Sequence, residues 1–157
     1  MTIADLGEFG LIAALAAGLP RGERTVVGIG DDAAVLTTPD GRVVATTDLL
    51  LEGLHFRRDW SVPADIGGKA AAQNLVDVAA MGAVPVALLV GFGAPGDLPL
   101  AWARELVVGI ADECARVGAT VVGGDTARAM YSRSPVCWGT RRQGWRCSKL
   151  GTQGPSR

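Results

Sequence analysis

The segment 64–81, ADIGGKAAAQNLVDVAAM, constrains the fold more than any other part of this sequence. Its alanine-rich composition favours a helix that ends before Gly82, with Pro85 shortly after it. Ala, Leu and Val occupy most of its sides, and a helix that is apolar on most sides is usually buried. The apolar run PVALLVGFG at 85–93 follows and predicts a buried strand. A buried helix beside a buried strand predicts a layered α/β domain.

Similar patterns fill the rest of the first 127 residues. β-Branched residues predict strands in 25–30 and 42–48, joined by the turn 39–41 as a hairpin or as neighbouring strands. The other expected elements are a first helix near 8–17, a helix that Asp97 caps and Gly118 ends, and a strand within 119–126. The order α-β-β-α-β-α-β predicts an α/β fold of the α+β sandwich type, with one mixed sheet covered by helices.

The segment 128–157 differs from the rest in charge and pattern. Residues 1–127 hold all 16 acidic and 8 of the 15 basic residues, a balance of 8 - 16 = -8, whereas residues 128–157 hold 7 basic residues and no acid, a balance of +7. We therefore expect one domain in 1–127 and a basic, irregular tail in 128–157. The aromatic and basic residues of the tail lie on no recognisable module, so no nucleic-acid partner is expected.

Several protein classes are excluded by the composition. No run of about 18 apolar residues occurs, which predicts no transmembrane helix and no membrane partner. The apolar stretch LIAALAAGL follows Asp5 and Glu8 and no basic residue, which does not fit a secretory signal. The three cysteines show no Cys-x-x-Cys spacing, so neither a disulfide framework nor a zinc site is indicated. These features predict a cytoplasmic protein.

Acidic residues recur where the predicted strands end. The adjacent pair Asp31 and Asp32 is unfavourable unless water, a cation or hydrogen bonds compensate the two like charges. Asp48 and Asp125 end other strands, and Asp77 lies on the 64–81 helix. If the strands ending at Asp32, Asp48 and Asp125 are adjacent, their carboxylates converge. For any one aspartate, a turn or helix cap is the alternative.

The threonines beside these acids complete a set of oxygen ligands. Hydroxyl groups of Thr46, Thr47 and Thr126 would lie next to the carboxylates. Hard oxygen ligands of this kind favour Mg²⁺, and Mg²⁺ ions held this way bridge the oxygens of a polyphosphate. The sequence therefore predicts a site for a magnesium-bound polyphosphate.

A polar stripe interrupts the otherwise apolar 64–81 helix. Lys69, Gln73 and Asp77 are spaced four residues apart and share one face, with Asn74 beside them. A polar stripe on a buried helix needs partners, so it is expected to line a cleft, and a solvated face is the alternative.

Other motifs give little support for a different chemistry. Gly28 and Gly30 lack the third glycine and the helix of a dinucleotide fingerprint, and no Walker A loop is present. No local motif supports a catalytic triad, and the single His55 is by default a structural or surface histidine. We therefore predict no catalytic nucleophile.

Five motifs in order carry a family resemblance: GEFGLI, GIGDDAAVL, TTDLLLEGLHF, KAAAQNLVDVAAMGAVP and GGDT. Between about residue 5 and residue 127 the chain closely resembles the thiamine-monophosphate kinase family, part of the aminoimidazole ribonucleotide synthetase-like superfamily. The resemblance implies ATP-dependent phosphorylation of thiamine monophosphate to thiamine diphosphate. The phosphate of the substrate would attack the γ-phosphorus of ATP directly, without a covalent enzyme intermediate.

The resemblance also assigns site residues. It implies several Mg²⁺ ions held by Asp32, Thr46, Thr47, Asp48, Asp77 and Asp125, a substrate contact at His55, and nucleotide contacts at Gly124 and Asp125. The roles of Asp31, Lys69 and Asn74 are left open. It further implies a homodimer whose sheets pair in a barrel-like interface.

The chain departs from the family after GGDT, where a second α/β domain is expected and residues 128–157 show no family motif. We hypothesise that a reading-frame shift or gene-model error replaced the continuation, and we expect weak nucleotide binding and little turnover. Two alternatives stay open: a related ATP-dependent synthetase, and a non-catalytic dimerising fragment that binds Mg²⁺ or nucleotide.

Overall fold

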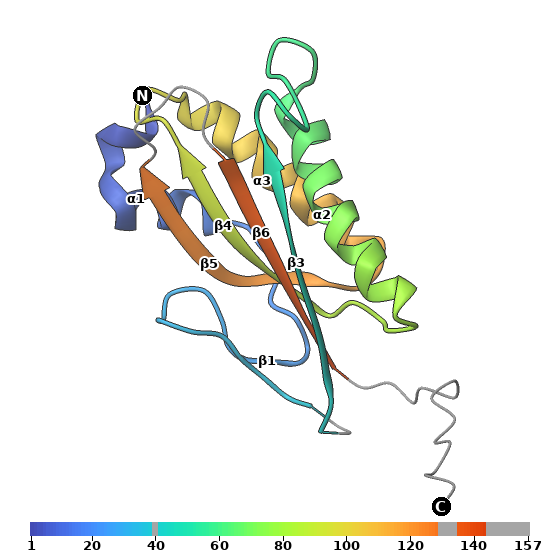
Figure 1. The fold of residues 1–157 in the computed structure, drawn as a ribbon. Helices are drawn as coiled ribbons and strands as arrows, with labels where there is room; N and C mark the ends of the chain where they lie inside the picture. Colours follow the sequence, from blue (N-terminus) through green and yellow to red (C-terminus); the bar gives the residue numbers. More distant parts are fainter. Residues whose placement is uncertain (39–40, 129–134, 144–157) are drawn as a thin grey trace, which may run out of the picture.

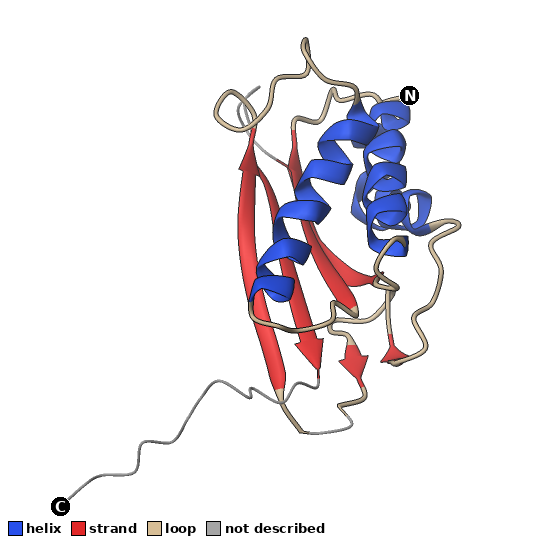
Figure 2. Ribbon diagram, turned by 90° about the vertical axis from the view of Figure 1, so that its right-hand side faces the viewer, coloured by secondary structure: helices blue, strands red, loops and turns tan. Residues whose placement is uncertain are grey.

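A computed structural model describes residues 1–38, 41–128 and 135–143 and shows helices packed on one face of a sheet (Figures 1 and 2). The helices are η1 (Ile3–Leu6), α1 (Gly7–Ala16), α2 (Pro63–Ala80) and α3 (Leu100–Ala115). The strands are β1 (Thr25–Val27), β2 (Val35–Leu36), β3 (Val43–Leu51), β4 (Ala87–Ala94), β5 (Thr120–Arg128) and β6 (Pro135–Gln143). The predicted α/β class is confirmed.

The main sheet is mixed and has four strands in the order β3-β6-β4-β5 (Figure 1). β4 and β5 run parallel, whereas β6 lies between β3 and β4 and is antiparallel to both. β1 and β2 form a separate antiparallel pair. The expectation that 25–30 and 42–48 pair or lie side by side is therefore wrong, because Thr25–Val27 pairs with Val35–Leu36 and β3 pairs with β6.

Strand β6 lies in the segment that was expected to be an irregular tail, and for Pro135–Gln143 that expectation is wrong. Pro135–Gln143 pairs with the backbone of two strands at once, although its sequence shows no apolar alternation. Main-chain hydrogen bonds do not depend on side-chain type, so a segment between two strands can be held without a strand pattern. Arg128 ends β5, and residues 129–134 and 144–157 lie outside the described residues. The boundary at residue 127 stays a prediction.

Helices α2 and α3 pack in backbone contact. A Cβ atom at Gly67 would collide with the Leu106 carbonyl, and one at Gly109 would collide with the Ala64 carbonyl. α2 ends as predicted before Gly82, whose φ of 68° suits glycine and whose N–H donates to the Ala79 carbonyl. These glycines hold the two helices close enough to cover the sheet.

The start of α3 differs from the prediction. Pro99, with φ of -60°, occupies the N-cap position, and no side chain caps the helix, so the expectation that Asp97 caps it is wrong. The end of α3 is as predicted, because Gly118 adopts φ of 70° and its N–H donates to the Ala115 carbonyl. Proline is tolerated just before the helix because its φ is fixed and no intrahelical hydrogen bond needs its missing N–H.

The two faces of the sheet differ in cover. On β3, side chains alternate: Leu50 joins the buried core under the helices, while Val43 and Leu49 on the other face stay 47% and 46% exposed. Figure 2 shows no described helix on that second face. Within the described ranges, no helix has both the length and the apolarity to cross a bilayer.

Candidate functional site

Side chains of β3 and α2 meet in a polar cluster, which we call the β3–α2 site: Thr46, Asp48, Gln73, Asn74 and Asp77. Gln73 Nε2 donates to Asp48 Oδ2, and the Asp48 backbone N–H donates to Asn74 Oδ1 at 3.0 Å. Thr46 Oγ1 donates to Asp77 Oδ2 at 3.4 Å, a long bond. The polar stripe of α2 therefore faces β3 and has protein partners rather than being wholly solvated. The cleft that it was expected to line stays a prediction, since neither described pocket includes the stripe.

The other end of the stripe holds the loop that follows β3. Lys69 Nζ donates to the His55 carbonyl, and the Leu51 N–H donates to His55 Nδ1 at 2.9 Å. Since Nδ1 accepts this bond, the hydrogen-bond network assigns the neutral His55 ring the tautomer with its proton on Nε2. The exposed His55 ring therefore offers a donor at Nε2.

An ion pair shapes the same loop further along the chain. Arg57 Nε donates to Asp59 Oδ1 at 2.9 Å, and the Arg57 guanidinium lies 4.2 Å from the Trp60 ring centroid. The hydrogen bond from Arg57 lowers the pKa of the Asp59 carboxyl. Both charged groups lie at the surface, so the pair orders the loop without adding a binding site.

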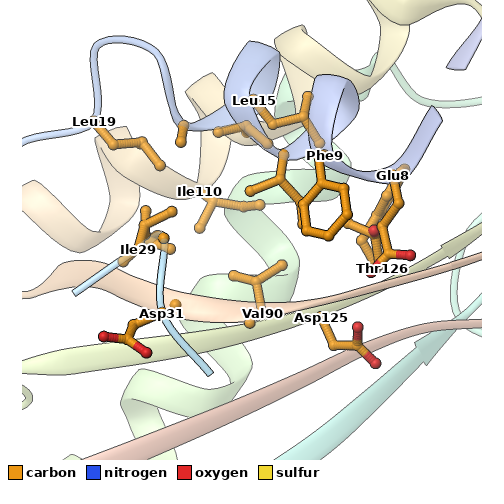
Figure 3. A pocket seen from close by; sticks show the side chains of 18 of the residues that line it. Glu8, Phe9, Leu15, Leu19, Ile29, Asp31, Val90, Ile110, Asp125 and Thr126 are labelled. Carbon is orange, nitrogen blue, oxygen red and sulfur yellow. The ribbon is translucent and has the colours of Figure 1, made fainter. Parts of the chain in front are cut away.

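A cavity of about 460 Å³ lies at the other edge of the sheet, between α1, α3, β5 and the turn after β1. We call it the α1–β5 pocket. Figure 3 shows Phe9, Leu15 and Ile110 on one side, with Asp31 and Asp125 on the opposite side. The pocket thus combines an apolar floor with an acidic rim, and such pockets are typical of small-molecule sites.

The acidic rim contains several of the residues expected from the sequence. Asp31, Asp32, Asp125 and Thr126 all line the α1–β5 pocket. The Asp32 N–H donates to Asp31 Oδ1 at 2.9 Å, so one role of Asp31 is to hold the turn. Gly124, also on the rim, has a packing reason to be glycine, because a Cβ there would collide with the Val90 backbone.

The predicted acids fall into two groups at opposite edges of the sheet. Asp48 and Asp77 belong to the β3 edge, Asp32 and Asp125 to the β5 edge, and strands β6 and β4 lie between. The expectation that these carboxylates converge is wrong within one chain, because the tail strand β6 separates β3 from β4. No group of three His, Cys, Asp or Glu in the described part of the chain could hold a metal ion.

Each group still fits Mg²⁺ chemically. Mg²⁺ keeps several waters and binds through one or two carboxylates plus the phosphates of a substrate, so it needs no all-protein cage. Asp48 and Asp77 with Thr46 supply two carboxylates and a hydroxyl, and Asp32 with Asp125 supplies two more carboxylates. Thr47 follows the strand alternation onto the uncovered face of β3 and is separated from Thr46.

Sequence reasoning missed the apolar half of the α1–β5 pocket. Ile29, Val107 and Ile110 line it, and Glu8 adds a further acid to the rim. The helical spacing of Val107 and Ile110 indicates a buried helix face, and a pocket floor produces the same pattern. The sequence signal that could have revealed the pocket is α1 itself. GEFGLIAALA is apolar around most of its circumference, so one apolar face has no core to pack against and can line a pocket.

Comparison with known proteins places these features in a family. The model for "AIR synthase related protein, N-terminal domain" matches residues 30–140, which extends past the predicted boundary at residue 127. Among curated relatives, thiamine-monophosphate kinase from Mycobacterium tuberculosis strain H37Rv is 49% identical over 124 residues, covering 79% of this chain and 37% of the relative. Its Corynebacterium glutamicum counterpart is 43% identical over 127 residues, with the same coverages. The chain thus spans 37% of the length of both relatives.

Solved structures agree with this assignment. Thiamine-monophosphate kinase from Stenotrophomonas maltophilia K279a matches with a TM-score of 0.68 and 29% identity, over 85% of this chain and 40% of the other. AaThiL in complex with AMPPCP and TMP matches with a TM-score of 0.62 and 29% identity, over 90% of this chain and 43% of the other. The chain therefore belongs to the AIR synthase related family and carries its N-terminal domain.

Proposed function

We propose that this chain is the nucleotide-binding and Mg²⁺-binding part of a cytoplasmic kinase that transfers the γ-phosphoryl group of ATP to thiamine monophosphate. The observation that carries the proposal is the α1–β5 pocket, where Asp31, Asp32 and Asp125 surround an apolar floor. Support comes from relatives named thiamine-monophosphate kinase and from a structural neighbour that binds AMPPCP and TMP. The product would be thiamine diphosphate.

The site residues divide the work by their position. Asp32, Thr46, Asp48, Asp77 and Asp125 would hold Mg²⁺ with their side chains, and Gly124 with Asp125 would contact the nucleotide. Thr47 would hold Mg²⁺ through its backbone carbonyl, because its side chain lies on the other face of β3. Bound Mg²⁺ neutralises charge on the phosphate oxygens during transfer. The γ-phosphoryl group would pass directly from ATP to the phosphate of the acceptor, without a covalent enzyme intermediate.

Other side chains would orient the two substrates and exclude water. The apolar floor at Phe9 and Ile110 can cover the ring system of the nucleotide whose contacts are Gly124 and Asp125. His55 would donate from Nε2 to a phosphate oxygen, because its Nδ1 is occupied by the Leu51 N–H. The pocket and the polar groups thus supply positioning, which is the main protein contribution in phosphoryl transfer.

We also propose a homodimer. The uncovered sheet face carries Val43 and Leu49, each nearly half exposed, and β3 is an edge strand. A second copy packed there would cover these side chains. Sedimentation of the purified chain should give a dimer at micromolar concentration, and a stable monomer would contradict this.

Purified chain with Mg²⁺, ATP and thiamine monophosphate tests the reaction. We expect thiamine diphosphate by chromatography, or, if residues beyond this chain are needed for turnover, Mg²⁺-dependent binding of a non-hydrolysable ATP analogue. Asp125→Asn should weaken that binding about tenfold or more, whereas Asp112→Asn, on the exposed surface of α3, should not change it.

The outcomes separate the open alternatives. Neither product nor nucleotide binding would contradict the proposal and favour a non-catalytic fragment. ATP consumption with a different acceptor would favour a related synthetase.

A further inference from the structure

Asn74 on α2 is unusual for its burial. It is 1% exposed and is the one polar or charged residue that counts as buried among the side chains the structure describes. Burying an amide is costly unless its donors and acceptors are paired. A buried asparagine in an Ala-rich helix therefore indicates that its amide makes specific hydrogen bonds.

The hydrogen bonds of Asn74 supply that reason. Its Nδ2 donates to the Ala70 carbonyl at 3.0 Å, and its Oδ1 accepts from the Asp48 backbone N–H at 3.0 Å. The two bonds together fix which end of the amide faces β3, since an acceptor must meet the N–H and a donor the carbonyl. Asn74 thus fastens one backbone position of β3 to α2.

That backbone position is otherwise open. β3 is an edge strand whose sole strand partner in the described sheet is β6, so every second N–H points away from the ladder. The N–H of Asp48 is one of these, because it donates to Asn74 instead. The side-chain amide completes the strand at the residue expected to bind a cation.

Gln73, next to Asn74, holds the carboxylate of the same residue. Its Nε2 donates to Asp48 Oδ2, which leaves Oδ1 as the oxygen not used by this bond. Asp48 is therefore held at two points by consecutive residues of one helix, once through its backbone and once through its side chain. Such support of a ligating carboxylate controls its orientation and commonly changes metal affinity 10- to 100-fold.

We propose that Gln73 and Asn74 are positioning residues that fix Asp48 so that a single carboxylate oxygen, Oδ1, faces a divalent cation. The inference rests on the proposed function only in taking Asp48 as a cation ligand. It gives Asn74 a role that the sequence left open, and it makes Gln73 part of the site through its hydrogen bond to Asp48. Lys69, further along the stripe, fixes the loop at His55 in the same manner.

Mn²⁺ binding to the full 157-residue chain, followed by electron paramagnetic resonance, tests the proposal. Gln73→Met keeps the length of the side chain and removes its donor. We expect it to weaken Mn²⁺ binding about tenfold while the melting temperature stays within about 2 °C of the original. Asp65→Asn, an exposed carboxylate in the first turn of the same helix, is the matched control and should leave Mn²⁺ binding unchanged.

Asn74 is tested by a second readout because its loss also affects folding. In Asn74→Ala, the Asp48 amide should exchange with solvent at least tenfold faster, and Mn²⁺ binding should weaken even when measured well below the lowered melting temperature. Gln73→Met or Asn74→Ala binding Mn²⁺ as tightly as the original chain would overturn the proposal, as would a chain that binds no Mn²⁺. A chain that binds Mn²⁺ but forms no thiamine diphosphate would count against the proposed function alone.

Discussion

The α2–α3 pair and the α1 side of the molecule cover the same face of the sheet in different ways. The α2–α3 pair packs backbone to backbone through Gly67 and Gly109. On the α1 side, Phe9 is 85% exposed and a pocket of about 460 Å³ remains between helix and sheet. Close packing is therefore confined to the α2–α3 pair, and the α1 side leaves room for a ligand.

The largest expected effect comes from adding a methyl group between α2 and α3. Gly67→Ala places a Cβ against the Leu106 carbonyl, so we expect a loss of about 3 kcal/mol in the free energy of unfolding. Gly68→Ala is the matched control, since the nearest atom to its Cβ would be 3.8 Å away. It should be neutral or stabilise the helix by up to about 1 kcal/mol. Urea denaturation measures both, and equal effects would contradict the described packing.

A pair of α1 variants tests the looser side. Leu11 is 6% exposed and belongs to the core, so Leu11→Ala should cost about 2 kcal/mol, at the low end for a buried leucine. Phe9→Ala should stay within about 0.5 kcal/mol, because the ring is mostly in solvent. If Phe9→Ala proves the costlier change under the same denaturation assay, α1 is packed with its other face inward.

The buried thiol of Cys114 in α3 makes the free energy of unfolding depend on pH. Burial raises the pKa of Cys114 to about 12 from a usual value of 9.0. A pKa raised by folding stabilises the fold below pH 9, and this contribution is lost as the pH rises toward 12. Between pH 7 and pH 10 the unfolding free energy should fall by about 1 kcal/mol from this group. The difference between the original chain and Cys114→Ala should shrink over that range, and a constant difference would contradict a buried thiol.

How far the sequence predicts this fold depends on whether an element carries its own periodic pattern. α2, α3 and β4 do, and each was placed within a few residues, because a helix or strand that buries one face repeats its apolar residues at a fixed spacing. β2, with two residues, and β6, held through its backbone between two strands, have no such pattern. Their pairing depends on neighbours that are distant in the chain.

The candidate site was predicted as a set of residue types but not as an arrangement. The chemistry of Asp32, Asp48, Asp77 and Asp125 follows from their carboxylates, whatever the topology. Their separation onto two sheet edges depends on β6, which has no sequence signal. The one geometric inference that depended on local spacing alone, the stripe through Gln73 and Asp77 facing partners, is confirmed because helical spacing does not depend on distant strands.

The smallest expected effect lies at the entrance to the α1 side, where a capping interaction replaces tight packing. Asp5 Oδ2 accepts the Thr2 N–H at 2.7 Å, and hydrogen bonds from Thr2 lower the pKa of the Asp5 carboxyl. A lowered pKa stabilises the fold above the usual value of 3.8, and this contribution is lost as the pH falls below it. Asp5→Asn should therefore speed amide exchange in Ile3–Leu6 at pH 7 without a measurable change in global stability.

Asp97→Asn, which removes an exposed acid that caps no helix, is the control and should leave exchange at the start of α3 unchanged. Faster exchange there would restore Asp97 as a cap, and unchanged exchange in Asp5→Asn would show that η1 is held by Ile3 in the core rather than by its cap.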